Sequence, residues 1–558
     1  MASTASTKSG SKKAKKQKAA VDNKTAAQAP AAAHADIPQR VWLISVFAIL
    51  LIAAVLRLYD LNLVPLHHDE GVNGNFLVRL VRDGEYRYDP ENYHGPTLYY
   101  FAALIPWIIR LLFGVAARDH YGLTTITIRL VPAVFGLGTI GLVFMLRRRL
   151  GTVAALSAAL LLAVSPGAVY LSRYFIHETQ FVFFTLAIVV FGLRFYDTRN
   201  PTWLILTSAS AALLFATKET AMISVGVLLI AFVLTHVYRR LYRNMVGQPS
   251  GKSRRSGVRH ESAFRRFMSE LGTTNLVISA AIAIIVFLFL NILFYSSFFR
   301  NAQGIYDALK TFEVWSKTGQ TAHVHPLFTY VKWLMLQEGP LLFMGAIGAV
   351  LVVLKPKNSM ALFAALWSFG LIAAYSLIPY KTPWLVLNFV VPLALIAGYT
   401  VQLIYEMERG QIRIVAMVLF IAMVVNTYQT IDLNFINYDN DDQYYVYVYA
   451  HTRRGTLDLV RTVEQIARER DGSKTGITIV SPDYWPLPWY LRDFSRTAYF
   501  GRMAQSTEPL IIANEAQKDE IETNFGELYR QVPSNDSSGS FELRPGVRLL
   551  LYVRRTGL

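Results

Sequence analysis

The sequence predicts an all-α polytopic membrane protein that ends in a small α/β domain. Of its 558 residues, 53% are hydrophobic and only 17% are charged, which is too apolar for an ordinary soluble protein of this length. Long apolar runs recur as far as about residue 431. Residues 432–558 instead alternate short helical and strand patterns, which predicts a separate domain.

Residues 1–38 precede the first apolar run and are rich in Ala, Lys, Ser and Thr without an apolar period, so we expect a disordered basic tail. This tail and the loop 239–272 carry much of the formal net charge of +17. Basic segments beside apolar runs are typical of cytoplasmic loops, so we expect contact with membrane lipids and not with nucleic acid. The absence of cysteine excludes thiolate metal sites and cysteine nucleophiles.

Twelve apolar runs are candidate spans. They begin near Val41, Thr97, Thr125, Val153, Phe181, Trp203, Ala221, Leu276, Phe328, Met360, Leu385 and Ile414. If all of them crossed, Arg147 to Arg149 would lie outside. The run Thr97–Phe113 is short and contains Pro106 and Arg110, so a helix in the plane of the membrane fits it better.

Eleven spans then remain in a transmembrane domain, 39–431, with in-plane helices in a first outer loop, 59–124. With this count every basic turn falls on the same side as the N-terminus, as expected for cytoplasmic loops. We therefore expect a multi-pass protein of the plasma membrane with a cytoplasmic N-terminus. The domain 432–558 would be extracytoplasmic.

This topology places six polar segments together on the outer face. They are His67–Glu70, Tyr93–Tyr100, Ser172–Gln180, Ala216–Thr220, His323–Tyr330 and Pro379–Trp384. Ionisable groups at the ends of spans are unlike a proton or ion pathway, which needs such groups at depth. The pattern predicts a cavity at the level of the membrane surface.

Carboxylates are the first chemical group in these segments. Asp69 and Glu70, in the loop after the first span, and Glu178 could accept a proton from a hydroxyl group. The alternative for Asp69 and Glu70 is a solvated loop or a helix cap, and for Glu178 a helix acid favoured by the dipole. His67 and His68 could join them in a metal site, but four consecutive residues cannot all face one ion. We expect no metal and no required cofactor, with a divalent cation as the alternative.

Cations are the second group. Arg173, Lys218 and Lys381 could hold a phosphate at headgroup level. The alternatives are interfacial anchoring for Arg173, snorkelling for Lys218 and an aromatic belt around Lys381. Acids beside a phosphate clamp suit transfer from a lipid-linked phosphosugar, because one carboxylate serves as base while the cations stabilise the departing phosphate.

The order of these motifs resembles a known family. HHDEGVNGNF, YHGPTLYYF, ATKETAMI and IPYKTPWLVLNFVVPLALIAGY are similar to motifs of the GT-C superfamily of membrane glycosyltransferases. The resemblance covers roughly Val41 to Tyr405. Within the superfamily it points to the group of dolichyl-phosphate-mannose-protein mannosyltransferases and aminoarabinose lipid A transferases, and more closely to a bacterial and archaeal branch associated with polyprenyl-linked glycan assembly.

The resemblance implies a polyprenyl-phosphate-sugar donor. It makes Asp69 the candidate base and Glu178 a second acid, with Lys218 or Lys381 near the phosphate. We also expect His68, His94 and Tyr380 to bind substrate. Two departures stand out: Glu178 occupies a position where relatives commonly have aspartate, and the segment that begins at His94 lacks their lysine or H-P-P-L pattern.

The predicted function is a hexosyltransferase, mannosyltransferase-like, that transfers sugar with inversion to a protein, glycan or lipid acceptor outside the cytoplasm. A lipid-linked glycan translocase or its accessory protein is the alternative, since it needs the same phosphate site but no base. An inactive scaffold is a third possibility.

The C-terminal region contains three regular elements that are visible in the sequence. TLDLVRTVEQIARE is typical of an amphipathic helix, and TGITIVS and GVRLLLYVRR are typical of strands. The aromatic residues Tyr484, Trp485, Trp489 and Tyr490 could stack on sugar rings, but packing is their commoner use.

Overall fold

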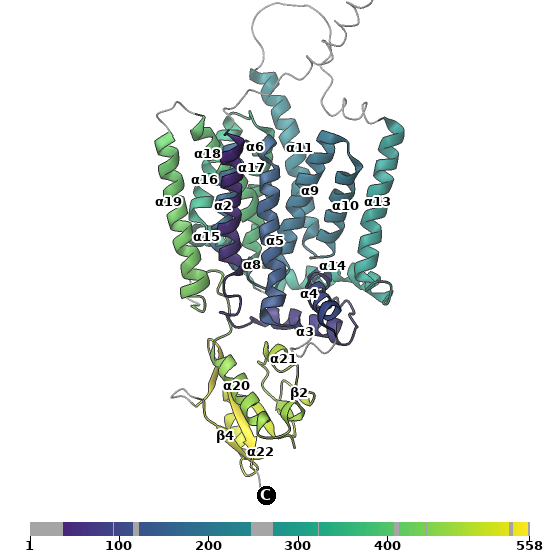
Figure 1. Cartoon of the computed structure of the whole chain (residues 1–558), viewed down its shortest axis with the longest axis vertical. Helices are drawn as coiled ribbons and strands as arrows, with labels where there is room; N and C mark the ends of the chain where they lie inside the picture. Colours follow the sequence, from purple (N-terminus) through teal and green to yellow (C-terminus); the bar gives the residue numbers. More distant parts are fainter. Residues whose placement is uncertain are drawn as a thin grey trace, which may run out of the picture. The chain divides into compact units, whose positions relative to one another are not determined.

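The computed structural model describes residues 37–92, 94–114, 122–246, 272–321, 323–406, 412–440, 444–534 and 539–555 (Figure 1). The chain divides into two compact units, residues 1–42 and 43–558. The described part of the first unit contains the start of one helix, and the second unit holds all other elements. Except for residues 37 and 38, the predicted disordered tail lies outside the described residues.

Helices, most of them apolar, make up most of the described chain before residue 437. They are α2 (Gln39–Leu58), α3 (His68–Arg82), α4 (Thr97–Phe113), α5 (Thr125–Met145), α6 (Arg147–Leu150), α7 (Thr152–Ala163), α8 (Pro166–Ser172), α9 (Glu178–Thr198), α10 (Pro201–Phe215), α11 (Ala221–Val246), α13 (Thr273–Tyr295), α14 (Gln303–Thr321), α15 (Thr329–Gln337), α16 (Gly339–Leu354), α17 (Ser359–Leu377), η2 (Pro383–Val386), α18 (Leu387–Tyr405), α19 (Ile412–Ile431) and η4 (Asp432–Ile436).

Eight of the described helices are long and apolar enough to cross a membrane, and the number rises to ten if two bent helix pairs each count as one span. The pairs are α7 with α8, bent by 61°, and α15 with α16, bent by 114°. Pro166 and Gly339 each begin the second helix of a pair, as expected where helices break. The predicted membrane fold is confirmed. The count of eleven is not, because α10 has only 15 residues.

The first outer loop is largely helical. α3 and α4 pack on each other at the end of the helix bundle that is nearer the C-terminal sheet (Figure 1). Asp69 and Glu70, which we expected in a loop, lie instead in the first turn of α3. The basic loop predicted at 239–272 also needs correction, because α11 continues to Val246; residues 247–271 lie outside the described residues.

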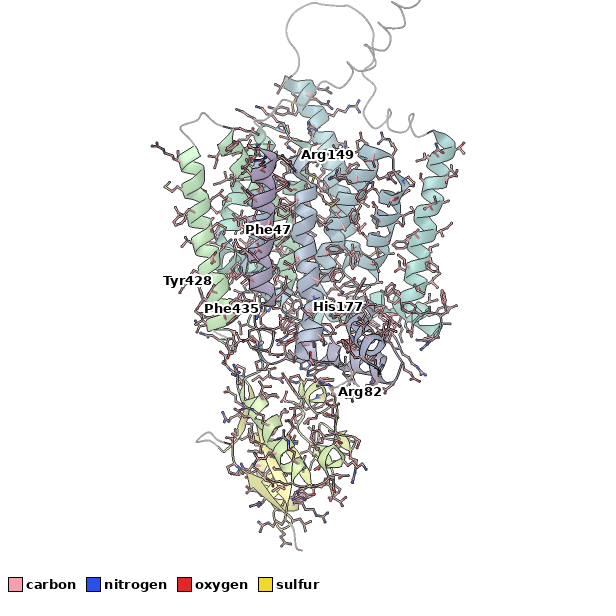
Figure 2. The ribbon with its side chains drawn as sticks, viewed as in Figure 1. Phe47, Arg82, Arg149, His177, Tyr428 and Phe435 are labelled. Atoms are coloured by element: carbon pink, nitrogen blue, oxygen red, sulfur yellow. The ribbon has the colours of Figure 1, made fainter. Side chains whose placement is uncertain are left out.

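The two ends of the bundle differ in the residues that they carry. His177 and Arg82 lie toward the end nearer the C-terminal sheet, whereas Arg149, in one of the basic turns, lies toward the opposite end (Figure 2). The separation of polar motifs from basic turns that the sequence predicted is therefore present. The separation arises because the chain crosses the bundle in alternating directions, so the segments after every second span lie at the same end.

The C-terminal region is a sheet with helices, as predicted. Its elements are α20 (Gly455–Arg468), η5 (Gly472–Lys474), β1 (Ile477–Ile479), α21 (Leu487–Tyr490), β2 (Thr497–Tyr499), β3 (Leu510–Asn514), η6 (Glu515–Gln517), α22 (Lys518–Phe525), β4 (Tyr529–Val532), β5 (Phe541–Arg544) and β6 (Val547–Arg554). The strand order is β2-β1-β3-β6-β4, with β5 also on β6; the β2-β1-β3 pairs are parallel and the pairs made by β6 are antiparallel.

Aromatic residues attach this domain to the first outer loop. Trp489 is buried in a cluster with side chains of α3 and α4. A Cβ on Gly74 of α3 would lie 2.6 Å from the Trp489 ring, so only glycine allows the contact. The Tyr490 hydroxyl accepts a hydrogen bond from the backbone N–H of Leu66 at 2.8 Å. The use of Trp489 and Tyr490 in packing is confirmed.

Candidate functional site

The first turn of α3 is built by a reciprocal cap. His67 precedes the helix, and its Nδ1 accepts a hydrogen bond from the backbone N–H of Asp69 at 3.1 Å. The Glu70 carboxylate accepts from the backbone N–H of His67 at 3.0 Å. Because Nδ1 accepts, the ring proton is on Nε2, which donates to the carbonyl oxygen of Tyr449 at 2.9 Å. The cap fixes the directions in which the side chains of Asp69 and Glu70 project from the helix.

Glu70 is fully buried, and its carboxylate is saturated with hydrogen bonds. Arg129 of α5 donates to it from Nε at 2.8 Å and from Nη2 at 2.6 Å. The backbone N–H groups of Phe175 and His67 also donate, at 2.8 and 3.0 Å. Four donors occupy the lone pairs of a carboxylate, so none remains for a substrate. Glu70 therefore ties α3 to α5 and to the segment after α8.

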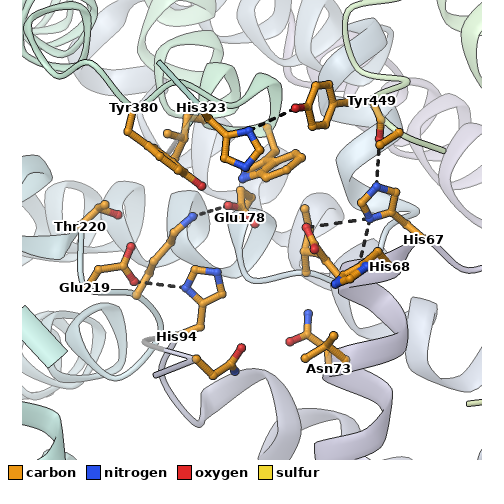
Figure 3. Close-up of a pocket in the computed structure, with 18 of the residues that line it drawn as sticks. His67, His68, Asn73, His94, Glu178, Glu219, Thr220, His323, Tyr380 and Tyr449 are labelled. Atoms are coloured by element: carbon orange, nitrogen blue, oxygen red, sulfur yellow. Dashed lines mark hydrogen bonds and ion pairs between the residues drawn. The ribbon is translucent and has the colours of Figure 1, made fainter. Parts of the chain in front are cut away.

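A cavity of about 400 Å³ lies beside this turn (Figure 3). Its walls come from the start of α3, the segment before α4, the start of α9, residues 218–220 and 449–450, and five side chains from the end of α17 onward, namely Tyr375, Ile378, Tyr380, Trp384 and Leu385. Six of the nine predicted site residues line it, namely His68, Asp69, His94, Glu178, Lys218 and Tyr380. The structure thus brings together residues that are more than 300 positions apart in the sequence.

Asp69 is a carboxylate of this cavity that is open to solvent, with 40% of its side chain exposed; Glu91, which also lines the cavity, is exposed as well. Among the described residues, no lysine or arginine forms an ion pair with Asp69; the Nδ1 of His67 lies 3.9 Å away. Beside it, burial lowers the pKa of His68, and the ring of Trp485 lies 6.0 Å from the His68 ring. An accessible carboxylate without a cation is available to accept a proton.

Glu178 and Lys218 form a second centre in the cavity. Glu178 is the first residue of α9, and its Oε1 accepts from the Lys218 Nζ at 2.5 Å, with both side chains about 5% exposed or less. Burial alone would lower the pKa of Lys218, but the carboxylates of Glu178 and Glu219 outweigh it and raise the pKa above its usual value. Lys218 therefore carries a positive charge inside the cavity.

Backbone pairing places His94 opposite this lysine. Residues His94 and Lys218 form an isolated antiparallel bridge, and the N–H of Gly95 donates to the Thr217 carbonyl at 3.0 Å. A Cβ on Gly95 would lie 2.0 Å from the carbonyl oxygen of Ala216, so glycine is required for this approach. The His94 Nδ1 lies 3.2 Å from the Glu219 carboxylate (Figure 3). The pair forms the wall next to Lys218.

Arg173 and Lys381 do not line the cavity. The Arg173 guanidinium donates to the carbonyls of Tyr59 and Asp60 at 2.5 and 2.8 Å and stacks on Phe435 at 4.6 Å. The Lys381 Nζ is buried and donates to the carbonyls of Ile378 and His325 at 2.6 and 3.2 Å. Both therefore act on the backbone of neighbouring turns. Lys218 is the one predicted phosphate-binding cation that this cavity contains.

Sequence reasoning did not single out several charged and aromatic lining residues, of which four stand close to the predicted groups or complete the wall. These four are Glu219, His323, Tyr449 and Arg544. Glu219 and His323 belong to the segments Ala216–Thr220 and His323–Tyr330, which the topology had already placed on the outer face. Tyr449 and Arg544 come from beyond the last span, and no spacing in the sequence links them to the cavity. Arg544 lies at an irregularity where β5 pairs with β6, and it forms an ion pair with Asp483.

The described residues contain no group of three or more His, Cys, Asp or Glu side chains arranged to hold a metal ion. The two buried carboxylates of the cavity are engaged separately, with Glu178 on Lys218 and Glu219 on His94. The donor set therefore does not suggest a preformed metal centre.

Comparisons with known proteins place this geometry in context. The family described as dolichyl-phosphate-mannose-protein mannosyltransferase matches residues 102–248. The structure of ArnT from Cupriavidus metallidurans bound to undecaprenyl phosphate is similar, with a TM-score of 0.57 and 14% identity over 91% of this chain and 98% of that chain. The archaeal oligosaccharyltransferase AglB from Archaeoglobus fulgidus, in complex with an inhibitory peptide and a dolichol-phosphate, has a TM-score of 0.52 and 13% identity over 93% and 74%. No curated protein sequence matches the chain.

These likenesses establish the fold. The chain is a multi-pass membrane protein with the architecture of the GT-C glycosyltransferases, and the predicted resemblance is confirmed at that level.

Proposed function

We propose that the protein is a membrane glycosyltransferase that moves a sugar from a polyprenyl-phosphate-sugar donor to an acceptor on the extracytoplasmic side of the plasma membrane. The observation that carries this proposal is the division of charge in the cavity. Asp69 is accessible and has no cationic partner among the described residues, whereas Lys218 is buried and held by Glu178. One centre is suited to take up a proton and the other to stabilise a departing anion.

Asp69 acts as the general base in this scheme. It accepts the proton of the acceptor hydroxyl while that oxygen attacks the anomeric carbon, and the bond from this carbon to the phosphate oxygen breaks. A double displacement would need a second carboxylate free to form a covalent intermediate. Glu178 and Glu219, the buried carboxylates of the cavity, are occupied by Lys218 and His94, and the exposed Glu91 is assigned no role in this scheme. The scheme is therefore a single displacement with inversion, in which Asp69 takes up the proton.

Lys218 stabilises the lipid phosphate that leaves. The ammonium group has three donors, and Glu178 occupies one of them in the structure. The other two can be directed at phosphate oxygens without loss of the ion pair. In this proposal Glu178 is a positioning residue that keeps Lys218 charged and oriented, and His68, His94 and Tyr380 surround the sugar. For Arg173 and Lys381, phosphate binding stays a prediction from their sequence motifs, to which the cavity adds no support.

The donor class and the location follow from the same reasoning. The similar ArnT structure contains undecaprenyl phosphate and the similar AglB structure a dolichol-phosphate, so we expect a lipid phosphate of the polyprenyl type here. A hexose such as mannose is the first donor sugar to test, because the matching family model is that of mannosyltransferases. The acceptor is a protein, glycan or lipid hydroxyl, and we expect transfer to need no metal.

The experiment is sugar transfer from radiolabelled polyprenyl-phosphate hexoses by the purified full chain in lipid nanodiscs, with and without EDTA. Wild type is compared with Asp69→Asn at matched concentration. General-base catalysis contributes roughly 10²- to 10⁴-fold, so the variant should lose at least a hundredfold. The anomeric configuration of the product, determined by NMR, should be inverted relative to the donor.

Equal transfer by both proteins would remove Asp69 from the role of base. A retained configuration would contradict the single displacement, and loss of transfer in EDTA would contradict the expected independence of metal. If neither protein transfers any of several sugars but both move a lipid-linked glycan between leaflets, the translocase is the better assignment.

A further inference from the structure

A second cavity, of about 900 Å³, lies at the opposite end of α3 from the first. Its walls come from the end of α3 and the residues after it, the second half of α4 and the turn after α13. Among its lining residues are Arg87, Trp107, Arg110 and Arg300, and none of them lines the first cavity. The proposed sugar transfer does not use this cavity.

An aromatic layer separates the two cavities. The Tyr86 ring lines the second cavity and lies 5.3 Å from Tyr99, which lies 5.6 Å from His177. The His177 ring is in turn 5.0 Å from His94 in the wall of the first cavity. The cavities therefore share a packed partition, and a ligand in the second one would not occupy the site of Asp69.

The second cavity is rich in guanidinium groups. Four arginines line it, at positions 82, 87, 110 and 300, against two acids, Asp83 and Glu85. Arg82 forms an ion pair with Asp493 of the C-terminal domain, but the charge of Arg300 is met by the carbonyl oxygen of Gly84 at 3.1 Å, which has no formal charge. Arg87 is exposed and makes no hydrogen bond or ion pair with another described residue. The lining is thus net positive.

The wall after α13 is held in an uncommon backbone conformation. Ser297, Phe298 and Phe299 have φ values of 51°, 57° and 67°, in the left-handed region that bulky residues rarely adopt. Ser297 Oγ donates to the Tyr86 carbonyl at 2.7 Å, and the Phe298 ring lies 4.8 Å from Tyr100. These contacts fix the turn that carries Arg300. Strain of this kind is retained where surrounding structure holds it, often at binding sites.

The surroundings place the opening of this cavity at the edge of the lipid. α13 packs one face on α10, but no residue in its spanning window is buried, so its outer face is open to lipid, and the cavity begins two residues after its end. On α4, Leu104, Ile108 and Leu111 are exposed by 47%, 53% and 84%, and Trp107 lines the cavity. Tryptophan and arginine at the end of apolar surface are typical of headgroup depth.

We propose that this second cavity binds the phosphate headgroup of an anionic membrane lipid, with Arg87 and Arg300 as its principal phosphate contacts. The hydrocarbon chains of the lipid then lie against the exposed apolar residues of α4 and α13. Arginine suits this role because its planar guanidinium can give two parallel hydrogen bonds to a phosphate. The occupant is a lipid and not a free anion, because the positive lining adjoins apolar surface on two sides.

Native mass spectrometry of the full chain tests this proposal. The protein, purified in detergent, is titrated with phosphatidylglycerol, with phosphatidylcholine and with inorganic phosphate. The test variant is Arg87→Gln/Arg300→Gln. The matched control is Arg502→Gln/Arg530→Gln, which removes the same charge from two exposed arginines of the C-terminal domain. Melting temperatures of all variants show whether they are folded.

We expect at least one phosphatidylglycerol to bind more tightly than phosphatidylcholine. The loss of two arginines near a lipid phosphate should weaken that binding by roughly tenfold or more, and the control should not change it. Equal loss of lipid binding in both variants would show that the effect comes from net charge alone, and would reject the proposed site. Tight binding of inorganic phosphate without preference for the anionic lipid would overturn the lipid assignment. Binding unaffected by Arg87→Gln/Arg300→Gln in a folded protein would also reject the proposal.

Discussion

Two ion pairs next to the cavity have the same charges but different surroundings. The Glu70 carboxylate receives two bonds from Arg129 and two from backbone N–H groups, and it does not line the cavity. Glu178 receives one bond from Lys218, and both residues line the cavity. A saturated pair holds elements together, whereas an unsaturated pair at a cavity wall retains donors for a ligand. Hydrogen-bond saturation therefore distinguishes the pair that is closed to a ligand from the pair that could contact one, although both are buried and have the same charges.

The largest effect should come from breaking the saturated pair. Glu70→Gln leaves the Arg129 guanidinium buried beside a neutral amide, and breaking such a pair by removal of one partner costs about 3–5 kcal/mol. We expect a large loss of thermal stability, measured by unfolding of the purified protein in detergent. Asp69→Asn is the matched control, because surface substitutions usually change stability by no more than about 0.5 kcal/mol. If Glu70→Gln is as stable as wild type, the ion pair of Glu70 with Arg129 does not stabilise the fold as we expect.

The unsaturated pair should affect transfer more than stability. Lys218→Gln removes the cation from the departing phosphate, and loss of one such electrostatic contact lowers kcat by roughly 10²- to 10³-fold. The variant also leaves Glu178 buried without its partner, so a double variant, Lys218→Gln/Glu178→Gln, provides the control. We expect the double variant to recover stability while transfer stays low. Recovery of transfer along with stability would show that Lys218 has a structural role alone.

A smaller effect is expected from the wall that the C-terminal domain supplies. Arg544 lines the cavity from β5, and its guanidinium is shared with Asp483. If it contacts bound substrate, Arg544→Gln removes a charge-assisted hydrogen bond of about 1.5–3 kcal/mol, which corresponds to a rise in KM of roughly tenfold or more. Initial rates over a range of acceptor and donor concentrations measure this change, with Arg530→Gln as the distant control. An unchanged KM for both substrates would exclude contact.

The smallest effect concerns pH. Burial lowers the pKa of His177 well below its usual value of about 6.5, so the folded protein keeps this ring neutral where the unfolded chain takes up a proton. The unfolded state therefore binds more protons below that pH, and stability falls as the pH decreases, by up to about 1.4 kcal/mol per unit per group. Melting temperatures from pH 7.5 to 5 should show this slope. His177→Gln should make it shallower, and an unchanged slope would assign it to other groups.

Much of the site could be predicted from the sequence because membrane topology is encoded locally. Apolar runs and basic turns fix which segments share one end of a helix bundle, and alternation then gathers the motifs around Asp69, Glu178 and Lys218. The amphipathic pattern of α20 and the apolar runs of β1 and β6 were equally local. These features depend on residues within one element, so composition and period were enough to find them.

The direction of each side chain was decided by the tertiary structure. Asp69 and Glu70 are neighbouring acids, yet the packing of Arg129 and Phe175 against Glu70 saturates one carboxylate and leaves the other accessible. In the same way, backbone carbonyls hold Arg173 and Lys381 away from the cavity.

In this protein the sequence by itself determined the membrane fold, the end of the bundle that carries the polar motifs and most of the cavity's lining residues. The tertiary structure decided which acid is saturated, which cation faces the cavity and that Tyr449 and Arg544 complete its wall. The physical reason is that hydropathy and chain alternation act over one span, whereas hydrogen-bond saturation depends on donors that come from elements distant in the sequence.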